Sequence, residues 1–362
     1  MHGMHATPGA GAKDTAKRAL LFALVFVGVV ALALALWKLR VLIALLLLAF
    51  IVAAAMRPGV ESLKRRYRIP RGAGILLHYA GLAALLGVLL WLVVPRAIDQ
   101  IQRATSSDRL ESEARETTGV KHDLLVGLQE RLEELPSGAE LVDPALELTL
   151  TAFEVALGLF FVLAAAGYWI FERDRAVDLL ASLLPRSRRK IMRDTWNLID
   201  LKLGAYVRGQ GLLIVLVATT LSTIFWAIGL PFWLLIGVFA GVVEIVPVVG
   251  PLVAGALAVG VGLTESFTIG IAAGIAVLVV RLVEDYLVIP RVLGDAVGLS
   301  PLLVLTSVAG VALLFGEVAV LLAIPIAAVL ATLVDVIVLD KDPAEEEVPT
   351  VIFAAKDAET AG

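Results

Sequence analysis

Repeated apolar stretches of about 20 residues constrain the fold of this chain more than any other feature of its sequence. A helix of that length crosses the hydrocarbon core of a bilayer, whereas a soluble domain has no need of several such stretches. Composition agrees, because 59% of the residues are hydrophobic and 18% are charged, against about 25% charged residues in soluble domains. Eight runs occur, at about 19–37, 41–56, 73–95, 148–171, 209–229, 231–263, 267–289 and 301–338. The sequence therefore predicts an all-α membrane protein with about eight transmembrane helices.

Two of these runs are too long for one simple span, and both are interrupted. The interrupting residues are Pro247, Gly250 and Pro251 in the run 231–263, and Gly316 and Pro325 in the run 301–338. Proline lacks a backbone donor and clashes with the preceding turn of a helix. Irregular backbone at membrane depth persists only where protein or a water-filled cavity surrounds it. We therefore expect broken or re-entrant helices in the C-terminal half, and re-entrant hairpins could replace full spans there.

The distribution of charge between the runs predicts the orientation of the chain. Residues 57–71 hold six basic residues and one acid, and residues 172–208 hold nine basic residues and five acids. Residues 96–145 hold six basic residues and eleven acids. Because Lys and Arg are enriched in cytoplasmic loops, the first two segments are expected inside and the third outside. Both termini are then cytoplasmic.

The first run could be mistaken for a signal peptide, because Lys13, Lys17 and Arg18 precede it. It is longer than an ordinary signal core, and a second run begins at Val41. We therefore expect a retained helix.

These features divide the chain into seven segments. They are a disordered cytoplasmic N-terminus (1–18), three N-terminal transmembrane helices (19–95), an extracytoplasmic helical segment (96–147), a transmembrane helix (148–171), a basic cytoplasmic helical segment (172–208), a C-terminal transport core (209–338) and a disordered acidic tail (339–362). The extracytoplasmic segment is expected to be amphipathic, because leucines recur at helical spacing at positions 124, 128, 132 and 135. Its apolar face requires a partner, either its own membrane domain or a neighbouring subunit.

Catalytic and cofactor signatures are missing from the sequence. There is no cysteine, no phosphate-binding loop, no H-E-x-x-H zinc motif and no G-x-S-x-G nucleophile motif. A formal net charge of -4 does not indicate a nucleic-acid partner. We therefore expect a protein that is not an enzyme and has no cofactor, no metal and no nucleic acid.

Charged residues inside the C-terminal apolar runs are the best candidates for a binding site. A charge at the bilayer centre costs about 2.5–3.5 kcal/mol on insertion scales, so it faces a cavity or a partner. Glu244 stands three residues before Pro247, and a carboxylate beside a helix break is how many carriers bind a cation or polar solute. A purely structural hydrogen bond is the alternative role for Glu244.

A second charged group lies in the run 267–289. Arg281, Glu284 and Asp285 are spaced i, i+3 and i+4, so they share one helix face. They either neutralise one another or form a gate or proton relay. Glu317, after Gly316, is either an interfacial residue or part of a site.

Several motifs in this half resemble those of a known family. They are Gly229-Leu230-Pro231-Phe232-Trp233, Glu244-Ile245-Val246-Pro247-Val248-Val249-Gly250-Pro251, Pro290-Arg291-Val292-Leu293-Gly294, Val297-Gly298-Leu299-Ser300-Pro301, Phe315-Gly316 and Leu322-Ala323-Ile324-Pro325. Together with Tyr206-Val207-Arg208-Gly209-Gln210 and the order of the segments, they resemble the autoinducer-2 exporter-like family of permeases over roughly 19–338. The chain departs from the usual residues of that family at Val248, Ser300 and Glu317.

The resemblance implies a multi-pass transporter of the bacterial cytoplasmic (inner) membrane, surrounded by the lipid bilayer. It also implies a homo-oligomer, of which a pentamer is one form. Members of the family are described either as exporters of autoinducer-2 or as sodium–proton antiporters, and fold-level analogy does not settle the substrate.

Three functions therefore stay open. The first is a secondary carrier that exports a small polar solute such as the quorum-sensing signal autoinducer-2. The second is a cation–proton antiporter that uses the same carboxylates, with proton coupling. The third is a membrane scaffold that transports nothing. For the two transport functions, the expected solute or ion site consists of Glu244, Pro247, Gly250, Pro251, Arg281, Glu284, Asp285, Pro290, Gly294, Ser300, Pro301 and Glu317.

Overall fold

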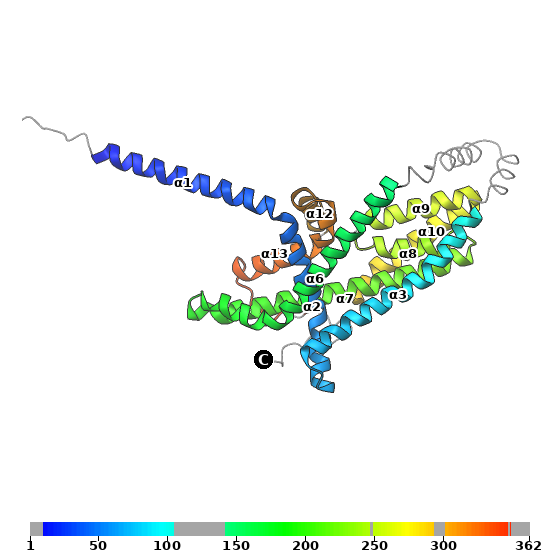
Figure 1. Ribbon diagram of the computed structural model, residues 1–362, viewed down its shortest axis with the longest axis horizontal. Coiled ribbons are helices and arrows are strands. Elements are labelled where there is room, and N and C mark those ends of the chain that lie inside the picture. Colours follow the sequence, from blue (N-terminus) through cyan, green and yellow to red (C-terminus); the bar gives the residue numbers. More distant parts are fainter. Residues whose placement is uncertain (1–9, 105–141, 247–248, 293–300, 347, 349–362) are drawn as a thin grey trace, which may run out of the picture.

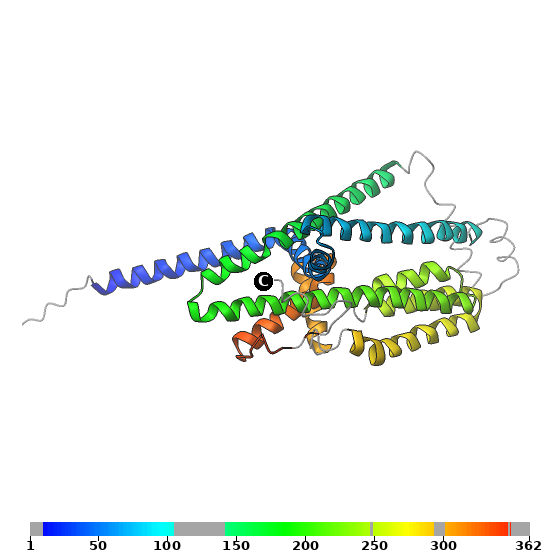
Figure 2. The same ribbon diagram turned by 90° about the horizontal axis from the view of Figure 1, so that it is seen from below.

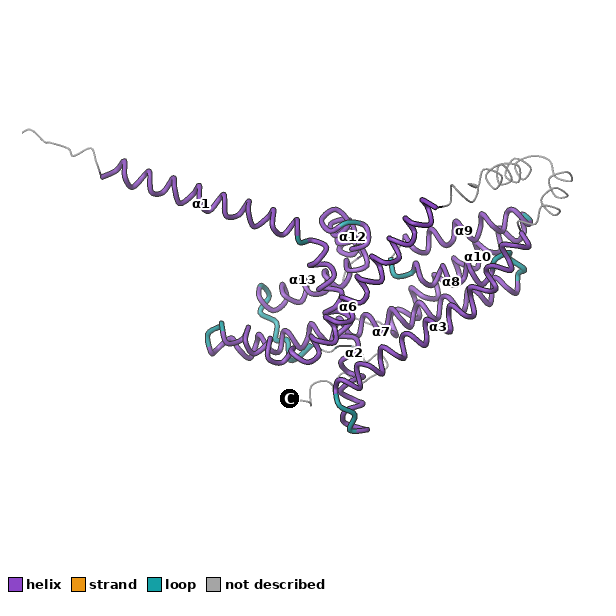
Figure 3. Tube along the Cα trace, viewed as in Figure 1, coloured by secondary structure: helices purple, strands orange, loops and turns teal. Residues whose placement is uncertain are grey.

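The computed structural model describes residues 10–104, 142–246, 249–292, 301–346 and 348, and within these ranges the regular structure is entirely helical (Figures 1 and 3). The N-terminal helices are α1 (Ala10–Lys38), α2 (Arg40–Tyr67), α3 (Arg71–Ala104) and α6 (Val142–Ser182). The later elements are η1 (Arg186–Arg188), α7 (Arg189–Ala227), α8 (Trp233–Val243), α9 (Val249–Glu265), α10 (Phe267–Val283), η2 (Glu284–Val288), α11 (Ile289–Val292), α12 (Pro301–Phe315), η3 (Glu317–Leu322) and α13 (Ala323–Ile337). The all-α fold predicted from the apolar runs is confirmed.

Seven of the described helical stretches are long and apolar enough to cross a membrane, by length and composition. They are Lys17–Lys38, Arg40–Tyr67, Arg71–Arg96, Thr149–Ser182, Arg186–Ala227, Phe267–Arg291 and Ala319–Ile337. The run 231–263 is not among them, because it folds into two shorter helices, α8 and α9. The number of candidate spans in the described residues is therefore one lower than the number of apolar runs.

The helices α8 and α9 form a helical hairpin against α7 and α10. Gly237 faces Ser222 while Gly241 faces Ala218, so α8 runs antiparallel to α7. Likewise α9 runs antiparallel to α10, because Gly262 lies against Gly270 near one end and Gly255 lies against Val277 nearer the other. Glu244, just after α8, contacts Arg281 near the end of α10. The end of α8 and the start of α9 therefore both lie near this contact. The two helices run away from it in the same direction. This is the arrangement of a re-entrant hairpin. Figure 1 labels both arms beside α7 and α10, and Figure 2 shows the same group of helices from below.

Small residues let the hairpin approach its neighbours closely. A Cβ atom on Gly241 would lie 2.6 Å from the Cβ of Ala218, and one on Gly262 would lie 2.7 Å from the Cα of Gly270. Side chains of Phe225, Leu230 and Ile236 fill the buried cluster that joins the same helices. In lipid, such close backbone packing replaces the hydrophobic effect as the main cause of helix association.

The last apolar run is broken at Gly316, as the sequence predicts, whereas the interruption expected at Pro325 is absent because this proline lies in the first turn of α13, where proline is tolerated. The helix α12 ends at Phe315, and Gly316 follows with φ of +93°. A positive φ suits glycine because it has no Cβ atom. The short element η3 then leads into α13, which packs against α7 and α12.

The N-terminal helix α1 differs from the others in its surroundings. It extends away from the remaining helices in Figure 1, and no residue of its most apolar window is buried. The leucines expected to form an amphipathic face, at positions 124–135, lie outside the described residues. The start of the acidic tail is described as far as Glu346, and Pro343 within it is buried. Residues 347 and 349–362 lie outside the described residues.

Candidate functional site

The tip of the α8–α9 hairpin positions the first candidate residue, Glu244. The helix α8 ends at Val243 in a tight turn, in which the N–H of Val246 donates to the carbonyl oxygen of Val243 over 3.0 Å. On the other arm, a Cβ atom on Gly250 would collide with that same carbonyl oxygen. The two arms can therefore meet here only because position 250 is glycine. This close approach leaves Glu244 buried, with 6% of its surface exposed.

Arg281 of α10 joins Glu244 to two further carboxylates. Its Nη1 atom lies 2.6 Å from Oε1 of Glu244 and 3.3 Å from Oε2 of Glu284. Its Nη2 atom lies 2.9 Å from Oδ1 of Asp285. The sequence placed Arg281, Glu284 and Asp285 on one helix face, and the structure adds Glu244 from the hairpin tip. We refer to these four residues as the tip cluster.

Glu284 is the most buried member of the tip cluster, with 2% of its surface exposed. Its Oε2 atom faces Arg281, whereas its Oε1 atom is buried and has no hydrogen-bond partner among the described residues. A buried polar atom without a partner costs about 1–3 kcal/mol. A carboxylate oxygen in this state is ready to accept a proton, a cation or a donor from a solute.

The local helix geometry around Glu284 is also unusual. Residues Glu284–Val288 form a π-helical turn between α10 and α11, inside the span Phe267–Arg291. Such turns are rare and occur often at functional sites. The turn begins at Glu284 and includes Asp285, so it lies within the tip cluster.

The charges of the tip cluster do not balance. One arginine faces three carboxylates, so two negative charges remain uncompensated within the cluster when all three acids are ionised. Charges in a poorly solvated environment need partners. The cluster can therefore bind protons, a cation or a solute with hydrogen-bond donors. Among the described residues, no group of three or more His, Asp or Glu side chains, the tip cluster included, has the arrangement of a metal site, so a cation would have to displace Arg281 from the carboxylates.

Gln210 of α7 is a further residue at the tip, and the sequence analysis did not select it as a site residue. Its Nε2 atom donates to the carbonyl oxygen of Glu244 over 3.2 Å. That carbonyl lies where the helical hydrogen-bond pattern of α8 ends, so the amide of Gln210 supports the break. The sequence contains a signal for this role, because Gln210 is a polar residue within the apolar run 209–229.

The other predicted site residues are not all brought to the tip cluster. Pro251 lies in the first turn of α9, where proline is tolerated, and Pro290 lies in α11 directly after the π-helical turn. Pro301 is the first residue of α12. Glu317 begins η3, an element that packs against α12, α13 and α2. Pro247, Gly294 and Ser300 lie outside the described residues.

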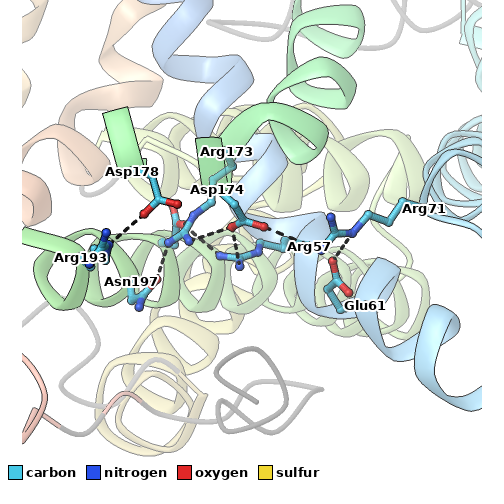
Figure 4. Close-up of polar contacts among 9 residues, drawn as sticks. Arg57, Glu61, Arg71, Arg173, Asp174, Asp178, Arg193 and Asn197 are labelled. Carbon is cyan, nitrogen blue, oxygen red and sulfur yellow. Dashed lines mark hydrogen bonds and ion pairs between the residues drawn. The ribbon is translucent and has the colours of Figure 1, made fainter. Parts of the chain in front are cut away.

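A second ionic network lies between the basic segments 57–71 and 172–208, and it was not predicted (Figure 4). Asp200 of α7 accepts hydrogen bonds from Arg173 over 2.8 Å and from Arg57 over 3.2 Å. Arg71 pairs with Glu61 over 2.7 Å. Additional contacts to Asp174 connect the arginines from α2, α3 and α6. Three arginines meet three acids here, so the network is balanced and ties these helices together.

A cavity of about 570 Å³ lies between α2, α6, α7, α12 and α13. Its wall is almost entirely apolar and includes Phe50, Trp169 and Trp196, whose rings contact one another edge-on or tilted. A polar solute would find few hydrogen-bond partners there. The tip cluster is therefore the better candidate for a solute or ion site.

Comparison with known proteins places these features in a family. The family model described as "AI-2E family transporter" matches residues 21–339. Relatives named "Putative transport protein" include YrrI and YueF from Bacillus subtilis (strain 168) and MT0215 from Mycobacterium tuberculosis (strain CDC 1551 / Oshkosh). YrrI is 24% identical over 79% of this chain and 83% of its own length, and YueF is 27% identical over 78% and 81%. MT0215 is 27% identical over 86% of this chain and 88% of its own length.

The match covers most of the chain, including the hairpin α8–α9 and the tip cluster. It agrees with the resemblance that the motifs around Glu244 and Pro290 indicate. The chain belongs to the AI-2E family of transporters.

Proposed function

We propose that this chain is a secondary transporter that binds a small polar solute at the tip cluster and exports it with proton or cation coupling. The observation that carries the proposal is the meeting of Glu244, from a broken helix, with Arg281, Glu284 and Asp285 from a different helix. Carriers commonly place solute and ion sites at broken helices, where freed backbone groups and carboxylates are available together.

The ion pairs suggest how binding is linked to movement. Arg281 holds the hairpin tip through Glu244 and holds the π-helical turn through Glu284 and Asp285. A proton, a cation or a solute donor on Glu244 would compete with Arg281 for the carboxylate. Binding then weakens the contact between hairpin and α10, and a ligand shifts a conformational equilibrium through such differential contacts.

The solute class follows from the chemistry of the cluster. Three carboxylates and one guanidinium offer hydrogen-bond acceptors and donors but little apolar surface, so a polar molecule rich in hydroxyl groups suits the cluster. Autoinducer-2 is the solute that the family description suggests, and it is our first choice for the transport assay.

Transport into liposomes tests this function. Purified parent protein and the Glu244→Gln variant are compared with Glu265→Gln, which alters an exposed acid at the far end of α9. The parent and the Glu265→Gln control should transport a solute from a polar panel that includes autoinducer-2, and Glu244→Gln should lose transport or its dependence on pH. If Glu244→Gln transports as fast as the parent with an unchanged pH profile, the site assignment is wrong.

A cation–proton antiporter is the second candidate, and the charge imbalance of the tip cluster favours it. Two uncompensated carboxylates can exchange a cation for protons without an organic solute. A pH-sensitive dye inside the liposomes distinguishes the two functions. Antiport predicts a pH change on adding sodium or potassium alone, whereas solute export predicts a change only when the solute is present. A membrane scaffold predicts neither response.

A further inference from the structure

Lys202 of α7 is a buried cation away from the tip cluster. It exposes 7% of its surface and faces α13, where its Nζ atom lies 3.3 Å from Oγ1 of Thr332. Thr332 is fully buried and donates its hydroxyl proton to the carbonyl oxygen of Ala328 over 2.9 Å. The hydroxyl oxygen is therefore free to accept a hydrogen bond from Lys202.

The acidic partner of Lys202 comes from the tail that follows α13. Oε1 of Glu346 lies 2.6 Å from the Nζ atom of Lys202, and Glu346 is the one carboxylate paired with this lysine in the described part of the chain. Asp335 of α13 is paired elsewhere, with Lys341 over 2.8 Å. A buried ammonium needs a partner, and here a segment outside the helix bundle supplies it.

The tail is held close to Lys202 by its own local structure. Pro343 is buried, and Oδ1 of Asp342 accepts a hydrogen bond from the N–H of Ala344 over 2.9 Å. The side chain of Glu346 is nevertheless 34% exposed. The carboxylate of Glu346 is thus accessible to solvent on one side while it covers the buried ammonium on the other.

We propose that the ammonium of Lys202, positioned by Thr332, is an anion-binding site at the face from which the tail leaves, and that Glu346 is its tethered occupant. The ligand class is a small anion that presents carboxylate or phosphate oxygens, which would replace the carboxylate of Glu346. An ammonium has three N–H donors, and one of them faces Thr332. The other two suit two oxygens of one anion. This site is separate from the tip cluster, so it does not depend on the proposed transport function.

The tether determines how the site responds to free anions. A group linked to its site by a short segment competes at an effective concentration in the millimolar range. In the parent protein, free phosphate must displace Glu346. Removing the carboxylate of Glu346 should therefore uncover Lys202 and let phosphate bind more readily.

Amine labelling of the full chain in mild detergent tests the proposal. The protein is treated briefly with an acylating reagent, and labelling of each lysine is quantified by mass spectrometry, with exposed Lys190 as the internal reference. The variants are Glu346→Ala and the matched control Glu345→Ala, which removes the neighbouring exposed acid. Each is labelled in sodium chloride and in sodium phosphate of equal ionic strength. Gel-filtration elution like that of the parent shows that the variants fold.

We expect Lys202 to label slowly in the parent and in Glu345→Ala. Labelling should rise about tenfold in Glu346→Ala, the size expected on loss of one charge-assisted hydrogen bond that covers the amine. Phosphate should restore protection in Glu346→Ala, while chloride should not. Unchanged labelling in Glu346→Ala, an equal rise in Glu345→Ala, or equal protection by chloride would each overturn the proposal.

Discussion

The guanidinium of Arg281 bridges to the carboxylate of Glu244 over 2.6 Å, although 37 residues separate them in the chain. This contact joins the tip of the α8–α9 hairpin to the end of α10. The same nitrogen atom of Arg281 also faces Glu284 over 3.3 Å. Arg281 therefore links the broken α8–α9 hairpin to the stretch Phe267–Arg291, which is long and apolar enough to cross a membrane.

Loss of Arg281 should destabilise the protein more than loss of Glu244. Arg281→Gln leaves three carboxylates together, and breaking a buried ion pair costs on the order of 3 kcal/mol. Glu244→Gln removes one of two excess negative charges and should change stability little. The double variant should be more stable than Arg281→Gln alone, because fewer like charges remain.

Thermal unfolding in detergent, followed by tryptophan fluorescence, gives the order of stabilities. Arg175→Gln is the control, since its ion pair with Glu172 is exposed and such pairs contribute about 0–1 kcal/mol. A double variant less stable than Arg281→Gln would show that Glu244 and Arg281 contribute independently.

A methyl group at position 250 should damage the hairpin tip. The Cβ atom of Gly250→Ala would collide with the carbonyl oxygen of Val243, so the two arms must separate around Glu244. Overpacking of this kind costs about 1–3 kcal/mol. We expect lower thermal stability and loss of transport into liposomes.

The matched control is Gly260→Ala in the same helix. A Cβ atom there meets nothing within 4 Å, and alanine favours helix over glycine by about 1 kcal/mol. Gly260→Ala should therefore be as stable as the parent or more stable. Equal behaviour of the two variants would mean that the close approach at position 250 has no role.

Asp200 should be essential for the network that joins α2, α6 and α7. Asp200→Asn leaves Arg57 and Arg173 near each other without the buried carboxylate, which costs about 3–5 kcal/mol. Asp178→Asn is the control, because its pair with Arg193 is exposed on both sides. We expect a clear fall in the unfolding temperature for Asp200→Asn and almost none for Asp178→Asn. Similar small shifts for both variants would contradict a structural role for Asp200.

The charge distribution predicts which loops face the cytoplasm, and the chain suits a direct test because it has no cysteine. In intact cells, an impermeant thiol reagent should label Ser112→Cys and should not label Ser187→Cys. After membrane disruption, both positions should react. The reverse pattern in intact cells would invert the proposed topology.

The sequence by itself determined the class of fold and where the helices break. Apolar runs of bilayer length have few stable alternatives to helices, because lipid offers no partner for free backbone groups. The interruption around Pro247 and Gly250 follows from local chemistry, as does the end of α12 at Gly316. Helical spacing also places Arg281, Glu284 and Asp285 on one face.

Only the tertiary structure decided how these helices and their charged residues contact one another. Hydropathy depends on length and composition, so it cannot distinguish a helix that crosses the membrane from a hairpin that enters and leaves on one side. The run 231–263 forms such a hairpin, made of α8 and α9. The contacts of Glu244 with Arg281, of Asp200 with Arg57 and of Lys202 with Glu346 join distant parts of the chain. Such pairs have no periodic signal in one sequence, because helix packing, rather than spacing along the chain, brings the charges together.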